Sequence, residues 1–232
     1  MRPRMMIVAG ALGAALVTLV GCTSGGVPTP GTSSSAPGGA SPTPGGTGTI
    51  GTAAPPTAEP SGDGVEYQVT YQFAVPNSEV SITNPSTAPN LPRLVAVYAA
   101  DHPEGNPTYQ RISFYFRGAF PSYRFHYVSG IVQDGSGEPV ALAGTYFLSV
   151  VFDGAQAHDD GAASTVAESP TRPVNLSGLR DYAPAGDFEG QVSYGLGVNG
   201  SGGNPAIRSG ELKRPDGAGD FFYVVHFDVR TG

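Results

Sequence analysis

The chain has 232 residues, 19 of them acidic and 12 basic, which gives a formal net charge of −7 at pH 7. An acidic protein gains nothing from releasing counterions on a nucleic acid, so we expect no DNA or RNA partner. The single cysteine, Cys22, allows no intramolecular disulfide, and the folded part must therefore depend on its own core.

Residues 1–21 have the features of an export signal. Two arginines precede the uncharged apolar run Ile7 to Val20, which at about 14 residues is shorter than the roughly 20 that a membrane-spanning helix needs. Leu19-Val20-Gly21 before Cys22 resembles a bacterial lipobox, in which the cysteine sulfur is acylated and the preceding peptide bond is cut. We therefore expect a lipoprotein held by acyl chains such as palmitate on Cys22, at the extracytoplasmic face of the cell membrane. A membrane-spanning anchor and an ordinary cleaved signal peptide are the alternatives.

Residues 22–62 have the composition of a linker. From Thr23 to Pro60 almost every residue is Gly, Ser, Thr, Pro or Ala. Such a segment has too little apolar surface to offset the entropy of ordering it, so the sequence predicts disorder. Fully stretched, the linker would reach over roughly 100 Å, enough to let an anchored domain sample the cell wall.

Residues 63–232 have the length of one domain, and apolar and polar residues alternate along most of it, as in β-strands. Glycine and proline separate the alternating runs. We expect a loop between Gly154 and Pro184, with a short helix around Ser177 to Tyr182 as the alternative, and an irregular connection from Pro76 to Pro92. The pattern indicates an all-β sandwich or barrel. The predicted strands are 65–73, 94–99, 111–117, 123–128, 146–152, 188–198, 206–212 and 221–229.

Several short motifs lie between Leu94 and Val229: Val95-Ala96-Val97, His102-Pro103, Arg111-Ile112, Phe114-Tyr115-Phe116, Pro121-Ser122-Tyr123-Arg124, Asp134 to Val140 and, most specifically, Phe188 to Gly197. By these motifs the stretch resembles the AMIN-like domain found in lipoproteins of high-GC Gram-positive bacteria. Gln110 stands where that family usually has Asp, and the loop from Pro215 to Asp220 is an addition. The resemblance implies a β-sandwich of short, mostly antiparallel strands, related to modules that place enzymes at peptidoglycan.

The sequence offers little for catalysis, metals or cofactors. It has no Gly-x-Ser-x-Gly motif, and the cysteine is assigned to acylation. His158-Asp159-Asp160 is the best local cluster, but adjacent loop residues rarely point at one ion. Asp134, Ser136 and Glu138 faintly resemble a calcium loop and fit a tight turn better. No predicted strand carries an obvious inward acid, so we expect no enzyme, no metal and no cofactor.

The candidate ligand-binding residues are polar members of two central strands. If the aromatic residues face the core, Arg111, Tyr115 and Arg117 point outward together, and Arg124 and His126 do so from what could be a neighbouring strand. Arginine pairs with carboxylates and tyrosine offers a flat face to sugars, and peptidoglycan carries both kinds of group. An ordinary polar solvent face explains the same residues.

We therefore expect a non-enzymatic envelope module that binds peptidoglycan or another wall glycan. The first alternative is a protein-interaction module that recruits an envelope enzyme or transporter through an edge strand or an apolar patch. Hydrolysis by an unrecognised site and a spacer without a ligand are the remaining alternatives.

Overall fold

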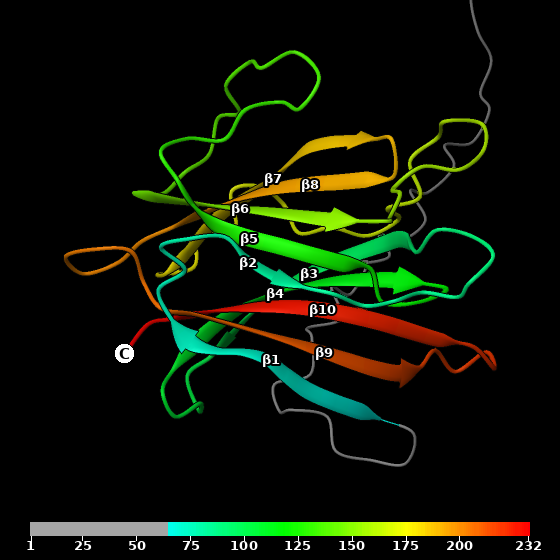
Figure 1. Cartoon of the computed structure of the whole chain (residues 1–232). Helices are drawn as coiled ribbons and strands as arrows, with labels where there is room; N and C mark the ends of the chain where they lie inside the picture. The colour runs from blue at the N-terminus through cyan, green and yellow to red at the C-terminus, as the bar shows by residue number, and fades with distance from the viewer. Residues whose placement is uncertain (1–64) are drawn as a thin grey trace, which may run out of the picture. The chain divides into compact units, whose positions relative to one another are not determined.

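A computed structural model of the protein describes residues 65–232 (Figure 1). The predicted export signal and linker, with Cys22, lie outside the described residues. No helix in the described part of the chain is long and apolar enough to cross a membrane. The strands are β1 (Glu66–Ala74), β2 (Val80–Ile82), β3 (Arg93–His102), β4 (Tyr109–Arg117), β5 (Ser122–Val128), β6 (Tyr146–Asp153), β7 (Leu179–Phe188), β8 (Gln191–Val198), β9 (Ile207–Pro215) and β10 (Phe221–Arg230).

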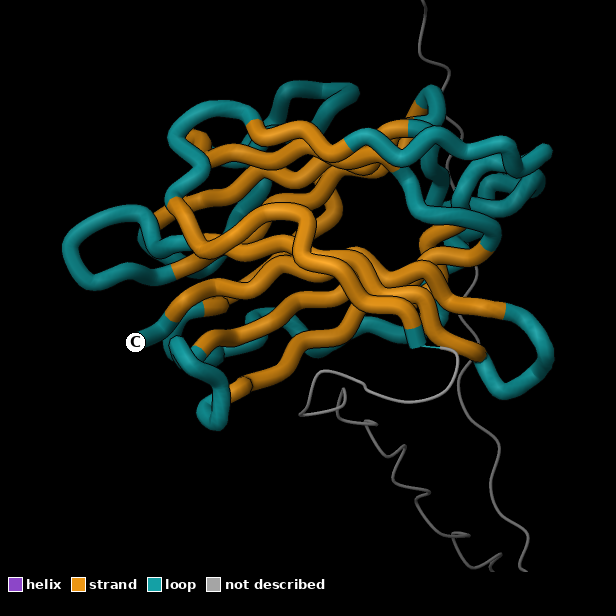
Figure 2. The backbone as a smooth tube through the Cα atoms, turned by 60° about the horizontal axis from the view of Figure 1, so that its bottom comes forward, coloured by secondary structure: helices purple, strands orange, loops and turns teal. Residues whose placement is uncertain are grey.

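The strands form two antiparallel sheets of five strands each. Sheet A has the order β1-β9-β10-β4-β3, and sheet B has the order β2-β5-β6-β8-β7. The two sheets pack face to face, with loops gathered at both ends of the strands (Figures 1 and 2). The predicted all-β sandwich is confirmed.

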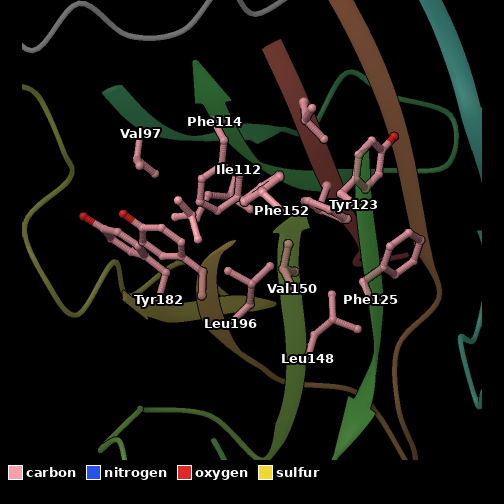
Figure 3. Close-up of a cluster of buried hydrophobic side chains, with 14 of the residues drawn as sticks. Val97, Ile112, Phe114, Tyr123, Phe125, Leu148, Val150, Phe152, Tyr182 and Leu196 are labelled. Carbon is pink, nitrogen blue, oxygen red and sulfur yellow. The ribbon is translucent and has the colours of Figure 1, made fainter. Parts of the chain in front are cut away.

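The space between the sheets is filled by apolar side chains from every second residue of the strands. On β4, Ile112, Phe114 and Phe116 are completely buried, as are Phe125 on β5 and Phe152 on β6. The rings of Phe114 and Phe152 lie 4.9 Å apart in a tilted arrangement, which is favourable for aromatic pairs (Figure 3). The period of two in the sequence therefore positions the core as expected.

The outer face of sheet A carries a second, smaller apolar cluster. Ala96, Tyr115, Leu212 and Val224 lie on four successive strands of the sheet and are all at least nine-tenths buried. This face is therefore not the simple solvent face that the alternation in the sequence suggests.

Two strands lie where the sequence predicted none. β2 has three residues within the proline-bearing stretch 76–92, too few to show a period, and it is held by pairing with β5. β7 begins within the predicted loop and replaces the short helix considered there. It ends at Phe188, the first residue of the predicted strand 188–198, and the turn at Glu189 and Gly190 separates it from β8. Its pattern is broken at Pro184 and Gly186, where the pairing with β8 shifts register. Proline is tolerated because β7 is the edge strand of its sheet.

Two glycines in the motif most specific to the resemblance make room for a loop. Gly195 and Gly197 lie on β8, and the loop after β5 passes over them. A Cβ at Gly195 would lie 2.5 Å from Ile131 and 2.8 Å from Leu142, and one at Gly197 would overlap the carbonyl oxygen of Ala143. Glycine is required here because the loop backbone approaches the sheet closely.

Candidate functional site

Arg111, the first predicted ligand-binding residue, is occupied by a buried ion pair. Its Nε and Nη2 donate to Asp228 at 2.6 and 3.0 Å, and the Asp228 carboxylate is fully buried. Arg208 donates to the same carboxylate at 2.8 Å. Burial by itself would raise the pKa of Asp228, but these arginine hydrogen bonds and charges hold it below its usual range. The pair therefore belongs to the structure of sheet A and is not available to a large ligand.

Tyr115 is also buried. Only 8% of the residue is exposed, and its ring makes edge contacts with Tyr98 and Phe222 within the outer cluster of sheet A. Burial raises the pKa of the Tyr115 hydroxyl. Its ring face is thus covered by neighbouring side chains.

Arg117 is partly exposed but has partners in the loop between β9 and β10. Its Nη1 donates to Asp216 at 2.6 Å and lies 3.6 Å from Asp220. Its guanidinium lies 4.1 Å from the centre of the Phe222 ring. Backbone amides of that loop, followed by Arg117, lower the pKa of Asp216 to about 2. Arg117 therefore anchors the loop between β9 and β10.

Arg124 and His126 lie on β5, in the other sheet. Arg124 is 3.3 Å from Asp153, and both Arg124 and His126 come within 3.9 Å of Glu79. Because β4 and β5 belong to the two sheets that enclose the core, their polar sides point in opposite directions. The five predicted residues therefore do not form one surface. The reason is the connection 118–121, which crosses between the sheets instead of closing a hairpin.

A different place in the fold combines a hollow with polar and aromatic groups. The chain leaves β2, runs along one end of the sandwich as residues 83–92, which we call the strap, and enters β3 (right side of Figure 1). Two adjoining hollows of about 420 and 300 Å³ lie against the strap and share Asn84 and Phe120. We call them together the strap groove. Volumes of this order are typical of ligand sites.

Glu211 forms part of the groove wall and is only 3% exposed. It lies on the inner side of β9, where Asn84 Nδ2 donates to one carboxylate oxygen at 2.7 Å and Gln68 Nε2 to the other at 3.0 Å. The expectation that no strand carries an inward acid was wrong. Ile207 on the same strand is buried in the main core. Because side chains alternate along a strand, Glu211, four residues later, could have been assigned to the same inner face from the sequence.

Further hydrogen bonds, within sheet B and between the sheets, hold the groove in shape. The backbone N–H of Asn84 donates to Ser122 Oγ at 3.0 Å, and its side chain also donates to the carbonyl of Pro121 at 3.0 Å. Beneath the groove, the hydroxyl of Thr70 lies 2.7 Å from that of Tyr123. Burial raises the pKa of Tyr123, so its hydroxyl stays protonated and able to donate. The polar groups of the groove are therefore fixed before any ligand arrives.

The groove can bind a polar ligand with some apolar surface. The strap supplies the hydroxyl of Ser86 and the amide of Asn90, and Phe120 supplies a half-buried ring packed edge-on against Tyr223. Asp153 lies at one end of the groove.

A hollow of about 500 Å³ at the opposite end of the strands is a weaker candidate. It is lined mainly by residues 199–206 and by Arg230, whose Nε donates to the carbonyl of Gly232 at 2.5 Å. Among the described residues that line it there is no aromatic side chain and no buried acid. It therefore offers fewer fixed contacts than the strap groove.

The histidine and acidic clusters considered in the sequence do not assemble a metal site. His158 pairs with Asp187 at 2.6 Å and not with its sequence neighbours. Residues 134–137 form a tight turn closed by the Gly137 amide and the Gln133 carbonyl at 2.8 Å, as the turn interpretation predicted. Within residues 65–232, no three metal-binding side chains come together.

Two five-stranded antiparallel sheets packed face to face, with a preformed groove at one end, place the chain among the β-sandwich modules. The AMIN-like domain model matches residues 92–215, just over half of the chain, and the protein belongs to that family. Membership suggests a module associated with the cell wall or envelope. The match includes Phe120, Asp153 and Glu211 of the groove and excludes Asn84 and Gln68. Searches among curated proteins and among solved structures gave no match.

Proposed function

We propose that the protein is a lipid-anchored envelope module that binds peptidoglycan or another wall polymer through the strap groove, without catalysis. The observation that carries the proposal is the set of fixed groups in the groove. The amide nitrogen of Asn84 donates to the Glu211 carboxylate at 2.7 Å across the two sheets, and Phe120 lies where the two hollows meet. Amides and carboxylates hydrogen-bond the hydroxyl and acetamido groups of wall sugars, while a ring packs against their apolar faces.

The position of the groove suits a tethered domain. The described chain begins at Val65, and Glu66 at the start of β1 lines the groove. A linker from Cys22 would thus join the domain at its binding end. Acyl chains on Cys22 contribute about 0.8 kcal/mol for each buried CH₂, so two or more chains make release from the membrane rare.

A protein-interaction module is the second candidate, favoured by two exposed apolar side chains at the same end. Phe188 is 69% exposed and Leu91 is 44% exposed. Phe188 ends β7 and Leu91 lies in the strap. The turn after β7 is close to the strap, since a Cβ at Gly190 would lie 3.5 Å from Leu91. An envelope protein that packs on this pair is the expected partner in that case.

The test is co-sedimentation with purified peptidoglycan of the chain without its first 21 residues, carrying Cys22→Ser so that it stays soluble. We expect saturable pelleting that Ser86→Arg reduces at least tenfold, because the new side chain fills the groove. Thr87→Arg is the matched control: it adds the same side chain to the next, exposed residue, which does not line the groove. Absence of pelleting would contradict wall binding, and pelleting unchanged by Ser86→Arg would contradict the groove.

A further inference from the structure

The charges around Glu211 suggest which chemical group the groove takes. Residues 65–232 contain three buried acids: Asp181, Glu211 and Asp228. Arg172 donates to Asp181 at 3.0 Å, and two arginines donate to Asp228. The hydrogen bonds that Glu211 receives from nitrogen come from two neutral amides. Glu211 is thus the one buried acid of the described chain without a cation against it.

We propose that the strap groove recognises a primary amine, with Glu211 as the carboxylate that receives the ligand's ammonium group. This inference rests on the proposed function, because the amine of interest is the free side-chain amine of a wall peptide. A buried carboxylate is stabilised by a charged donor more strongly than by neutral ones. A carboxylate has about four acceptor positions. The two amides use one on each oxygen and the Tyr123 hydroxyl also hydrogen-bonds Glu211, so at least one position is left for a ligand in the groove.

Lys213, the basic residue next to Glu211 on the same face of β9, is bound elsewhere. Lys213 lies two residues further along β9, on the same face of the strand. Its ammonium donates to Glu66 at 3.4 Å and lies 4.6 Å from the centre of the Phe221 ring. Lys213 therefore stays at the rim and leaves Glu211 to a ligand.

The other two acids that line the groove already have cations against them. Glu66 is paired with Lys213 at 3.4 Å and Asp153 with Arg124 at 3.3 Å, and no lysine or arginine is among the described residues that line the groove beside Glu211. Acidic side chains on the walls of a concave site raise the local concentration of a positively charged ligand. A neutral sugar would leave the Glu211 carboxylate without a cation, and an anionic ligand would be repelled by it.

The shape of the groove fits an amine carried on an alkyl chain. Phe120, Pro89 and Leu91 lie along the larger hollow, which continues at Phe120 into the hollow that contains Glu211. These side chains can pack against methylene groups while the ammonium reaches the carboxylate. The diamino acid of a wall peptide has this form wherever its side-chain amine has not been cross-linked. The groove would therefore distinguish uncross-linked from cross-linked wall.

The first test uses the same soluble protein with peptidoglycan before and after its free amines are acetylated. We expect acetylation to weaken binding at least tenfold, and Glu211→Gln to weaken binding to untreated peptidoglycan by a similar factor. Lys213→Gln is the control for a charge change at the rim and should leave binding within about threefold. Binding to untreated peptidoglycan that acetylation does not change would overturn the inference while the proposed function stands.

The second test does not depend on the wall. In a nuclear magnetic resonance titration, Nα-acetyl-lysine should shift the backbone amides of Asn84 and Glu211 saturably, and Nα,Nε-diacetyl-lysine should not. Equal shifts with both compounds, or none with either, would overturn the inference. Absence of pelleting together with a selective shift would instead contradict the wall-binding function and keep the amine site. Equal unfolding midpoints of Glu211→Gln and the unchanged protein show that its loss of binding is not loss of folding.

Discussion

Asn84 donates a 2.7 Å hydrogen bond to Glu211 across the gap between the two sheets. Asn84 follows the last residue of β2 by two positions and Glu211 lies on β9, so 127 residues separate them along the chain. The same amide group donates to the carbonyl of Pro121, which ties the strap to the turn before β5. This one side chain therefore holds together three segments that form the strap groove.

Replacing Asn84 should weaken both the fold and the groove. Asn84→Ala leaves the Glu211 carboxylate with one fewer donor in a buried place, which we expect to lower the free energy of unfolding by about 1–3 kcal/mol. Urea unfolding measures this change. Thr83→Ala, an exposed neighbour, is the control and should shift stability by less than about 0.5 kcal/mol. A neutral effect of Asn84→Ala would mean that water replaces the amide without loss.

Arg111 should matter for stability and not for ligand binding. Removing it leaves Asp228 buried with Arg208 as its remaining arginine. We expect Arg111→Ala to cost about 2–4 kcal/mol of unfolding free energy, slightly less than the full loss of a buried pair. Peptidoglycan binding by the folded fraction should stay unchanged. A folded Arg111→Ala protein that no longer pelleted would place the ligand on the outer face of sheet A instead.

His226 should make stability depend on pH. It is 1% exposed and stacked on Tyr67 with ring centroids 5.5 Å apart. Burial, followed by the charge of Arg111, lowers its pKa from 6.5 to about 3. Below pH 6.5 the unfolded chain binds a proton that the folded chain does not, so stability falls as the pH falls from 6.5 towards 3, by up to roughly 1.4 kcal/mol per pH unit.

Chemical unfolding at pH 7, 6, 5 and 4.5 measures this slope. Asp228, with its pKa below the usual value, adds to the loss only below about pH 4, so the interval above 4.5 reports mainly on His226. His226→Phe keeps a ring against Tyr67 and removes the titrating group. We expect a flatter profile for this variant and stability within about 1.5 kcal/mol of the unchanged protein at pH 7. Identical slopes for both proteins would exclude His226 as the cause.

The glycines of β8 should tolerate no side chain. Gly197→Ala places a methyl group against the backbone carbonyl of Ala143, and we expect a loss of about 2–4 kcal/mol as the loop is displaced. Gly130→Ala is the matched control, since a Cβ there meets nothing within 4 Å. Thermal unfolding of both variants checks the difference. Equal midpoints would show that the loop does not press on β8.

Most of the strands could be predicted from the sequence, because the alternation of apolar and polar residues is a local pattern. It was insufficient for β2, which has three residues, and for β7, where Pro184 and Gly186 interrupt the pattern. Both strands exist because a neighbouring strand supplies their hydrogen bonds, which is a property of the assembled sheet. Local propensity cannot report such pairing.

The burial of the predicted ligand-binding residues could not be predicted from local sequence either. Strand parity placed Arg111 and Tyr115 on the outside of sheet A, and they do lie there. Their burial depends on Asp228 and Phe222 of β10, more than a hundred residues away in the chain. Glu211 was missed because the outward residue next to it, Leu212, is apolar and belongs to the outer cluster.

The most direct test of the central claim is hydrogen–deuterium exchange of the soluble protein with and without solubilised peptidoglycan fragments. It maps the bound surface without any substitution. We predict slower exchange in the strap, residues 83–92, in the turn 118–122 and around Glu211, with no change at Arg124 and His126. Protection confined to sheet B, or to residues 199–206 at the other end of the sandwich, would contradict the assignment of the strap groove as the binding site.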